Sequence, residues 1–206
     1  MDHQTVLQGM QQLSHLDRDV KEAFTELGMP EVRVRPSGFE TFLFTIISQQ
    51  LSTKAATTIM GRALGLMEET TPDQFMKIPA QSLRDAGLSF RKIEYTQGLA
   101  EAVLDGTFNI DGLENFSDED AIKEIIKLRG LGRWSAEIYL MFSLGRMDVF
   151  PADDLGLLVG LQLMKGLDSR PTPKQAREMV KHWTPWRSIG ALFLWHYYHH
   201  HISTLN

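Results

Sequence analysis

The amino-acid sequence predicts an all-α fold, because signals that start and end helices recur along it while signals for strands are scarce. Thr71-Pro72 is a capping residue followed by a proline suited to a first helical turn, and Gly87 and Gly106 each follow an apolar stretch as helix-ending glycines. The β-branched run Val32-Arg33-Val34 is too short to build a sheet. We therefore expect about nine to eleven short helices and no sheet.

Each expected helix has its own local signal. Phe90–Asp105 carries apolar residues at helical spacing, and Ser117 stands three residues before Asp120 in a weak form of the capping box. Prolines suited to a first turn stand at Pro173 and Pro185. In chain order, the expected helices are Asp17–Leu27, Phe39–Ser48, Thr71–Lys77, Pro79–Ala86, Phe90–Asp105, one that Ser117 caps, one from about Arg133, one from about Leu155, and two that begin at Pro173 and Pro185.

Composition excludes several classes of protein. The 206 residues are 43% hydrophobic, enough for one core or two small lobes, and no cysteine is present. Disulfides, thiolate zinc sites and iron–sulfur clusters are therefore excluded. No run approaches about 18 apolar residues, and the N-terminus lacks the pattern of a signal peptide. We expect an intracellular, soluble protein, cytoplasmic if bacterial and nuclear if eukaryotic.

The charge distribution bears on a nucleic-acid partner. The net charge of −5 argues against one, because DNA binding draws on positive charge. The segment 127–146, however, contains four basic residues and one acid, and the acids concentrate elsewhere, as at 111–120. An acidic protein can still present one basic face. The four basic residues are Lys127, Arg129, Arg133 and Arg146, and the acid is Glu137.

A helical hairpin is expected over Asp118–Leu144, with the turn Leu128-Arg129-Gly130-Leu131-Gly132 between its helices. Two glycines spaced by one residue allow a tight turn and a close approach of the backbone to a ligand. The N–H groups that open the second helix could bind a phosphate. Taken alone, the pattern favours an ordinary αα-hairpin with a glycine turn.

The residues after the hairpin make a resemblance specific. The stretch at 128–157, LRGLGRWSAEIYLMFSLGRMDVFPADDLGL, resembles the hairpin, loop and aspartate of the helix-hairpin-helix DNA glycosylases, and it is most similar to the 3-methyladenine DNA glycosylase II family. FETFLFTIISQQLSTKAATTI at 39–59, GLSFRKIEYTQGLA at 87–100 and WTPWRSIGALFLWHYY at 183–198 agree with it. The resemblance is to the short, all-helical form, without the β-rich N-terminal domain of larger bacterial members.

The resemblance implies a two-lobed fold with a DNA-binding cleft between the lobes, within one glycosylase unit over 1–206. The expected lobes are 38–146, which contains the hairpin 118–144, and 1–37 together with 147–206. It also implies excision of alkylated purines from double-stranded DNA in base excision repair, by base flipping and hydrolysis of the N-glycosidic bond. We expect a monomer that needs no cofactor.

The resemblance places the catalytic carboxylate at Asp154. A carboxylate beside C1′ stabilises the positive charge that develops on the sugar and can orient or deprotonate the attacking water. We expect Asp153 to be the N-cap of the helix from about Leu155. The alternative is that both aspartates only cap that helix.

Four residues are expected to line the pocket for the flipped base. Trp134 and Trp195 match family tryptophans, and aromatic faces attract an electron-poor, cationic purine; the alternative for both is core packing. Ile138 and Leu155 stand where relatives carry aromatic residues. This less aromatic pocket favours labile adducts, 3-methyladenine and 7-methylguanine.

Further DNA contacts are implied at the loop 48–53 and at the hairpin. Leu51 is the natural wedge to fill the gap left by the flipped base, unless it is a helix-end core residue. Ser52 stands where fungal relatives carry histidine. The implied DNA-binding residues are Gln50, Leu51, Ser52, Thr53, Gly130, Gly132 and Arg133.

Family members often bind Na⁺ or K⁺ through hairpin carbonyls, which correspond to those of Ile126, Leu128 and Leu131. The histidines at 196 and 199–201 lack a cysteine or a spaced carboxylate partner, so we expect surface and packing roles.

Three other functions stay open. A bifunctional glycosylase/lyase would carry a lysine directly after the hairpin arginine, where this chain has Trp134. A non-catalytic helix-hairpin-helix DNA-binding module would need the hairpin but neither Asp154 nor the tryptophans. An acidic helical scaffold for proteins would show no salt-dependent DNA affinity.

Overall fold

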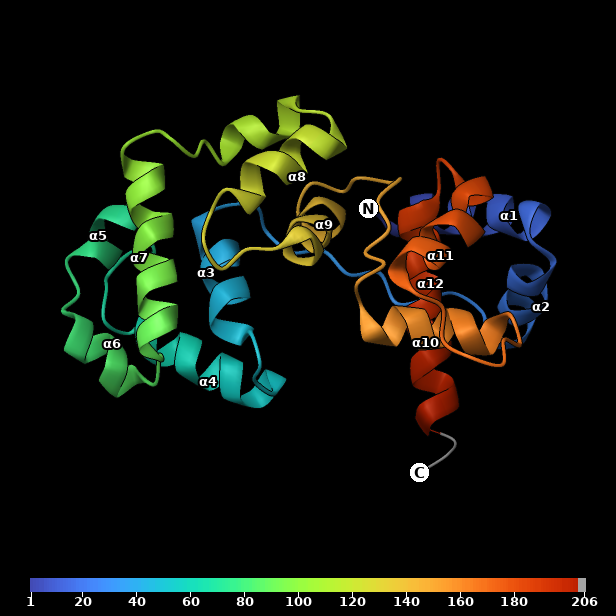
Figure 1. Ribbon diagram of the computed structural model, residues 1–206, viewed down its shortest axis with the longest axis horizontal. Coiled ribbons are helices and arrows are strands. Elements are labelled where there is room, and N and C mark those ends of the chain that lie inside the picture. Colours follow the sequence, from blue (N-terminus) through green and yellow to red (C-terminus); the bar gives the residue numbers. More distant parts are fainter. Residues whose placement is uncertain (204–206) are drawn as a thin grey trace. The chain divides into compact units, whose positions relative to one another are not determined.

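The computed structural model describes residues 1–203, and within that range it contains helices and no strand (Figure 1). The expected all-α class is confirmed. The helices are, in chain order, α1 (His3–Leu16), α2 (Arg18–Leu27), α3 (Phe39–Ser48), α4 (Thr53–Leu64), α5 (Pro72–Met76), α6 (Ala80–Ala86), α7 (Phe90–Leu104), the 3₁₀ turn η1 (Asp111–Asn115), α8 (Asp118–Ile126), α9 (Arg133–Phe142), α10 (Leu155–Met164), α11 (Pro173–Met179), the 3₁₀ turn η2 (Lys181–Trp183) and α12 (Arg187–Ser203).

The described residues form twelve α-helices where about nine to eleven were expected, and α1 and α4 are the two that were not expected. The sequence does contain a signal for α1. Asp2 caps it by accepting a hydrogen bond of 2.8 Å from the Thr5 N–H. Val6, Met10 and Leu13 follow at helical spacing and are fully buried. At the other end of the chain, the helix expected from Pro185 begins at Arg187. The last helices therefore follow the predicted order with small shifts at their ends.

The chain divides into two compact units. The central unit comprises residues 35–139, and the terminal unit comprises residues 1–34 and 140–206. The expected lobes had their bounds at 38 and 146, so the structure moves the second bound back into α9. The loop that leads to Asp154 thus belongs entirely to the terminal unit.

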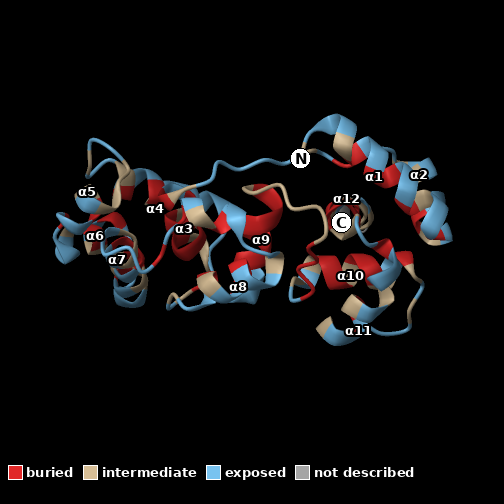
Figure 2. Ribbon diagram, turned by 90° about the horizontal axis from the view of Figure 1, so that it is seen from above, coloured by how far each residue is buried: buried red, intermediate tan, exposed pale blue. Residues whose placement is uncertain are grey.

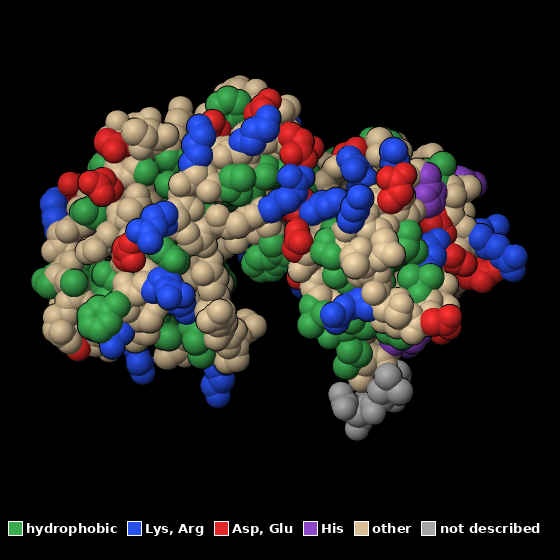
Figure 3. Space-filling view, in the orientation of Figure 1, with side chains coloured by type: hydrophobic (Ala, Val, Ile, Leu, Met, Phe, Trp, Pro, Cys, Tyr) green, Lys and Arg blue, Asp and Glu red, His purple; other side chains and the backbone are tan. Residues whose placement is uncertain are grey.

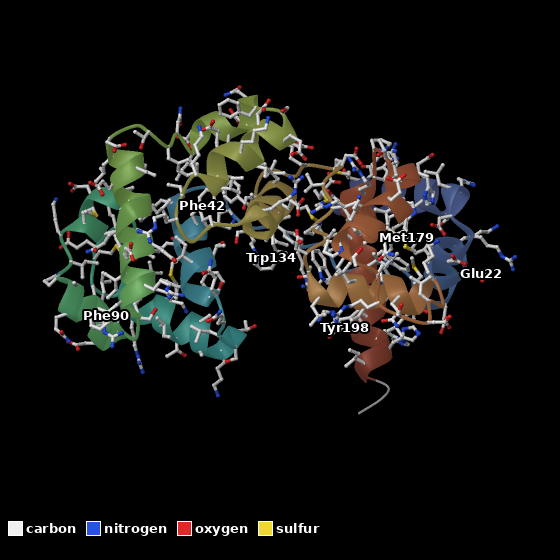
Figure 4. The ribbon with its side chains drawn as sticks, in the orientation of Figure 1. Glu22, Phe42, Phe90, Trp134, Met179 and Tyr198 are labelled. Atoms are coloured by element: carbon white, nitrogen blue, oxygen red, sulfur yellow. The ribbon has the colours of Figure 1, made fainter. Side chains whose placement is uncertain are left out.

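The core of the central unit forms around α3, which is apolar on almost every face and is largely buried (Figure 2). Phe42, labelled in Figure 4, stacks on Tyr139 with ring centroids 4.1 Å apart and meets the edge of Phe108 at 5.4 Å. The Tyr139 hydroxyl accepts a hydrogen bond from the Gly38 N–H just before α3 begins. Aromatic packing therefore holds α3 against α9.

The core of the terminal unit forms where α10 packs on α12. A Cβ at Gly160 would lie 2.5 Å from the Leu194 carbonyl oxygen, so only glycine permits this close approach. Asp17 provides a buried polar anchor: it caps α2 and accepts hydrogen bonds from Lys165 and from the Trp183 indole. None of the helices over residues 1–203 has the length and apolar character needed to cross a membrane.

Candidate active site

The loop that precedes Asp154 is fixed to the first turn of α12. Arg187 forms a two-pronged ion pair with Asp148, at 2.7 and 2.9 Å. The Ser188 hydroxyl donates to the Val149 carbonyl and accepts from the Val149 N–H, both at 2.9 Å. Arg177 donates to the Phe150 carbonyl at 2.6 Å. This chain of contacts leaves the loop little freedom and sets the position at which α10 begins.

Asp154 is the N-cap of α10 and is half-buried. Its Oδ1 atom accepts a hydrogen bond of 2.9 Å from the Leu157 N–H and one of 2.8 Å from the Trp195 indole Nε1–H. The positive end of the helix dipole interacts favourably with a negative charge at this position. A carboxylate is thus held in one orientation by its own helix and by α12.

The expectation that Asp153 caps this helix is wrong. Asp153 is exposed, and its Oδ2 atom pairs with the Arg177 guanidinium at 3.3 Å. The reason is the start of the helix: α10 begins at Leu155, so the preceding residue, Asp154, stands in the capping position. Asp154 therefore caps the helix and also accepts a hydrogen bond from Trp195. The alternative considered from the sequence, in which both aspartates cap α10 and do nothing else, does not match the structure.

Three further side chains surround the start of α10. The ring of Trp195 lies against Phe142, with centroids 5.8 Å apart. Leu155, at the first position of the helix, is 58% exposed. Tyr198, labelled in Figure 4, lies 3.4 Å from where a Cβ at Gly156 would be. Trp195 and Leu155 are thus accessible side chains next to the carboxylate, as a substrate pocket would need.

The hairpin of the central unit has the predicted form, with α8 and α9 joined by the glycine turn. Gly130 has a φ of +91°, and a Cβ there would overlap the ring of Tyr95. Gly132 differs: it is exposed, its φ is not positive, and no atom lies within 4 Å of where a Cβ would be. Gly130 is therefore required by the fold itself, whereas Gly132 leaves open space beside the N-terminus of α9.

Three of the four basic residues expected to form a basic face are paired with acids, so their positive charge is compensated. Figure 3 shows basic and acidic side chains side by side over α8. Arg133 contacts both Glu119 and Glu137, and Glu137 is only 1% exposed. The remaining pairs are Arg129 with Glu94 and Lys127 with Glu124.

The loop between α3 and α4 presents its four predicted DNA-binding residues in different ways. Gln50 is exposed and has a φ of +58°, the one positive φ outside glycine in the described range. Leu51 is 38% exposed, so it is not a helix-end core residue. The Ser52 hydroxyl caps α4 by accepting from the Ala55 N–H at 3.3 Å, and Thr53 begins that helix.

A cavity of about 240 Å³ in the central unit brings two groups of predicted residues together. Trp134 and Ile138 line it from α9, and Leu51 and Thr53 line it from the loop. Trp134 is 38% exposed, so it is not simply a core residue, whereas Ile138 is buried. The other lining residues are Arg35, Phe44, Thr45, Ser48 and Ala56.

Of the carbonyls proposed for a monovalent cation, that of Ile126 is at the end of α8, and those of Leu128 and Leu131 are in the hairpin turn. The Leu128 carbonyl accepts a hydrogen bond of 3.1 Å from the Leu131 N–H, so this turn is a compact one. A carbonyl has a second lone pair, so this bond leaves it able to meet a cation. Over the described residues, no group of three or more histidine, cysteine or acidic side chains is arranged to hold a metal ion.

Two contacts in the central unit were missed by the sequence analysis. Gln49 donates from Nε2 to the Gly130 carbonyl at 2.6 Å. Lys92 donates from Nζ to the carbonyls of Ile47 and Gln49, at 2.7 and 2.8 Å, and burial lowers the pKa of this ammonium group. Neither contact has a local sequence signal, because each joins residues more than 40 positions apart.

The helical hairpin, its glycine turn and the aspartate at the start of α10 together define a helix-hairpin-helix protein. The family model described as HhH-GPD superfamily base excision DNA repair protein matches residues 43–185, and the chain belongs to this family. The family expected from the sequence is confirmed.

Relatives of known name are similar over most of the chain. A putative DNA-3-methyladenine glycosylase of Bacillus subtilis is 34% identical over 77% of the chain and 58% of its own length. DNA-3-methyladenine glycosylase 1 of Schizosaccharomyces pombe is 32% identical over 76% of the chain and 71% of its own length. The chain thus spans little more than half of the first relative and about seven tenths of the second.

Solved structures of similar proteins have the same fold as this chain. The 3-methyladenine DNA glycosylase of Schizosaccharomyces pombe in complex with abasic DNA has a TM-score of 0.82 at 30% identity, over 91% of this chain and 95% of that one. A DNA-3-methyladenine glycosidase from Bacillus halodurans has a TM-score of 0.83 at 31% identity, over 91% and 87% of the two chains.

Proposed function

We propose that this chain is a monofunctional DNA glycosylase that removes alkylated purines from double-stranded DNA by hydrolysing the N-glycosidic bond. Family membership supports a role in base excision repair, and the names of its relatives support alkylated bases as substrates. The structure of one relative holds abasic DNA, which is the product of such a reaction.

The observation that carries the proposal is the oriented carboxylate of Asp154. Leu157 and Trp195 hold its Oδ1 atom from two directions, and the carboxylate is half-buried at a helix N-terminus. A negative charge fixed beforehand stabilises a developing positive charge without having to reorganise during the reaction. Asp154 would thus stabilise the oxocarbenium-like sugar and orient or deprotonate the water that attacks C1′.

Substrate selection would depend on stacking. Alkylation at N3 or N7 makes a purine cationic and a good leaving group, so a strong general acid is not needed. Trp134 and Trp195 offer accessible aromatic faces that attract such a ring. Ile138 and Leu155 are aliphatic, so the chain would favour labile adducts such as 3-methyladenine and 7-methylguanine and would release hypoxanthine slowly.

The protein would bind DNA without recognising a particular base sequence. The N–H groups at the start of α9, beside the open space at Gly132, would bind a phosphate. The loop Gln50–Thr53 would contact the bases next to the lesion, with Leu51 as the wedge. The carbonyls of Ile126, Leu128 and Leu131 would hold Na⁺ or K⁺, which would add positive charge beside the phosphate. Such a protein would act as an intracellular monomer.

The test compares Asp154→Asn with Asp153→Asn on methylated duplex DNA, with the released bases separated by chromatography. Asp154→Asn removes the charge but keeps the shape, so release should fall on the order of 100-fold or more while DNA affinity is retained. Asp153→Asn is the matched control and should stay within a few-fold of wild type, since its partner is Arg177.

Other outcomes separate the alternatives. Undiminished base release by Asp154→Asn would show that another group is the catalyst. DNA binding without any base release by the wild type would favour a non-catalytic binding module. A covalent DNA adduct trapped with borohydride would favour the glycosylase/lyase.

A further inference from the structure

The loop between α3 and α4 contains a turn that is unfavourable for its own sequence. The Leu51 N–H donates to the Ser48 carbonyl at 3.2 Å, Gln49 has φ and ψ of −55° and 130°, and Gln50 has a φ of +58°. These are features of a type II turn, whose third position favours glycine because of its positive φ. A glutamine in that position is strained, so surrounding contacts must maintain the conformation.

Two long-range contacts supply that support. From one side, the Lys92 ammonium donates to the carbonyls of Ile47 and Gln49, which flank the end of α3. From the other, the Gln49 side chain donates to the Gly130 carbonyl at 2.6 Å. The first contact fixes the start of the turn, and the second joins the turn to the hairpin.

The acceptor in the hairpin is closely packed. Gly130 has a positive φ, and its backbone lies so near the ring of Tyr95 that a side chain would overlap that ring. The bond from Gln49 therefore joins the turn Ser48–Leu51 to the packed hairpin segment Leu128–Gly132. In the proposed function, the first enters the base stack and the second binds a phosphate.

We propose that Gln49 is a positioning residue that makes the wedge turn and the phosphate-binding hairpin move as one body. This inference rests on the proposed function, because only a protein that everts a base needs to fill the gap that the base leaves. When the hairpin binds a phosphate, the turn is already set at a fixed distance along the duplex. The free energy needed to order the turn is spent when the protein folds, so it does not add to the free energy of everting the base.

The test uses Gln49→Met, which keeps the length of the side chain and removes the N–H donor. The matched control is Gln81→Met, a change of an exposed glutamine in the same unit whose partner is Asp85. Single-turnover release of 7-methylguanine is measured from two duplexes, one with cytosine opposite the lesion and one with an abasic analogue opposite it. The second substrate needs less work to evert the base.

Gln49→Met should slow release from the paired duplex about tenfold, the effect of one lost hydrogen bond, and release from the unpaired one less than twofold. Gln81→Met should leave both rates and their ratio unchanged. Lys92→Met removes the other contact that supports the turn. It should also slow release from the paired duplex more than release from the unpaired one. Equal slowing of both substrates by Gln49→Met, or no slowing of either, would overturn the proposal.

A second measurement separates this proposal from the proposed function. The Leu51 amide closes the turn, so its hydrogen exchange reports whether the turn stays formed. Faster exchange of that amide in Gln49→Met, with the same melting temperature, supports the tether even if the wild type releases no base. Unchanged exchange would show that Gln49 does not hold the turn.

Discussion

The indole N–H of Trp195 donates a hydrogen bond of 2.8 Å to Oδ1 of Asp154. The sequence analysis assigned Trp195 to the base pocket, and the structure adds a second role for it. Because α12 also holds the preceding loop through Arg187 and Ser188, one helix sets both the position and the orientation of the carboxylate. Trp195 and Asp154 are therefore expected to act as a pair.

Trp195→Phe should lower the rate of base release about tenfold while keeping an aromatic ring beside the substrate, because it removes one hydrogen bond to a charged group. The measurement is single-turnover release of 7-methylguanine. Trp186→Phe, the same change elsewhere in the terminal unit, serves as the control and should leave the rate unchanged. Equal rates for Trp195→Phe and wild type would show that the bond is not needed to orient Asp154.

Gly130→Ala should mainly lower the stability of the protein, whereas Gly132→Ala should mainly weaken DNA binding. Gly130→Ala should destabilise the protein by about 1–3 kcal/mol, because its φ is positive and the added Cβ overlaps Tyr95. Gly132→Ala should change stability by less than about 0.5 kcal/mol, since its Cβ meets open space, yet it should weaken DNA binding. Denaturant unfolding and DNA titration check the two effects. Unchanged DNA affinity in Gly132→Ala would argue against a close approach of phosphate.

Arg133→Met should destabilise the protein by about 2 kcal/mol, because it removes an ion pair with a carboxylate, that of Glu137, which is only 1% exposed. Arg129→Met removes an exposed ion pair with Glu94 and should cost less than about 1 kcal/mol. Urea unfolding of both variants gives the comparison. A loss for Arg129→Met as large as that for Arg133→Met would contradict the importance given to burial.

Acid should destabilise the terminal unit through Asp17. Burial alone would raise the pKa of this carboxyl. Hydrogen bonds from Lys165, Trp183 and His182 together lower it by more than burial raises it, so the pKa lies below its ordinary value of 3.8. A lowered native pKa contributes stability that is present above pH 3.8 and lost as the pH falls through the native pKa.

Lys165→Met removes the main ionic partner of Asp17, so it should raise that pKa and move the midpoint of acid unfolding to higher pH. At pH 7 it should cost about 3 kcal/mol, because the carboxylate remains buried. Circular dichroism during acid titration measures the midpoint. Lys181→Met, which removes an exposed pair with Glu178, is the control, and an identical midpoint in the two variants would count against the Asp17 network.

Much of the fold could be predicted because helix ends have local causes. The caps at Asp17, Thr71 and Ser117, and the left-handed Gly87, are contacts between residues a few positions apart. The start of α10 shows the limit of such reasoning. A difference of one residue moved the cap from Asp153 to Asp154, and the loop contacts that decide it come from α11 and α12.

The sequence by itself determined the helical class, the hairpin with its glycine turn, the family, and the aspartate expected to be catalytic. Only the tertiary structure decided that Trp195 orients Asp154, that Gln49 joins the turn to Gly130, and that acids neutralise the hairpin arginines. The physical reason is distance along the chain: these bonds join residues 41, 81, 35 and 14 positions apart. Caps and periodic apolar positions act within one or two helical turns, whereas such partners meet only after the helices have packed.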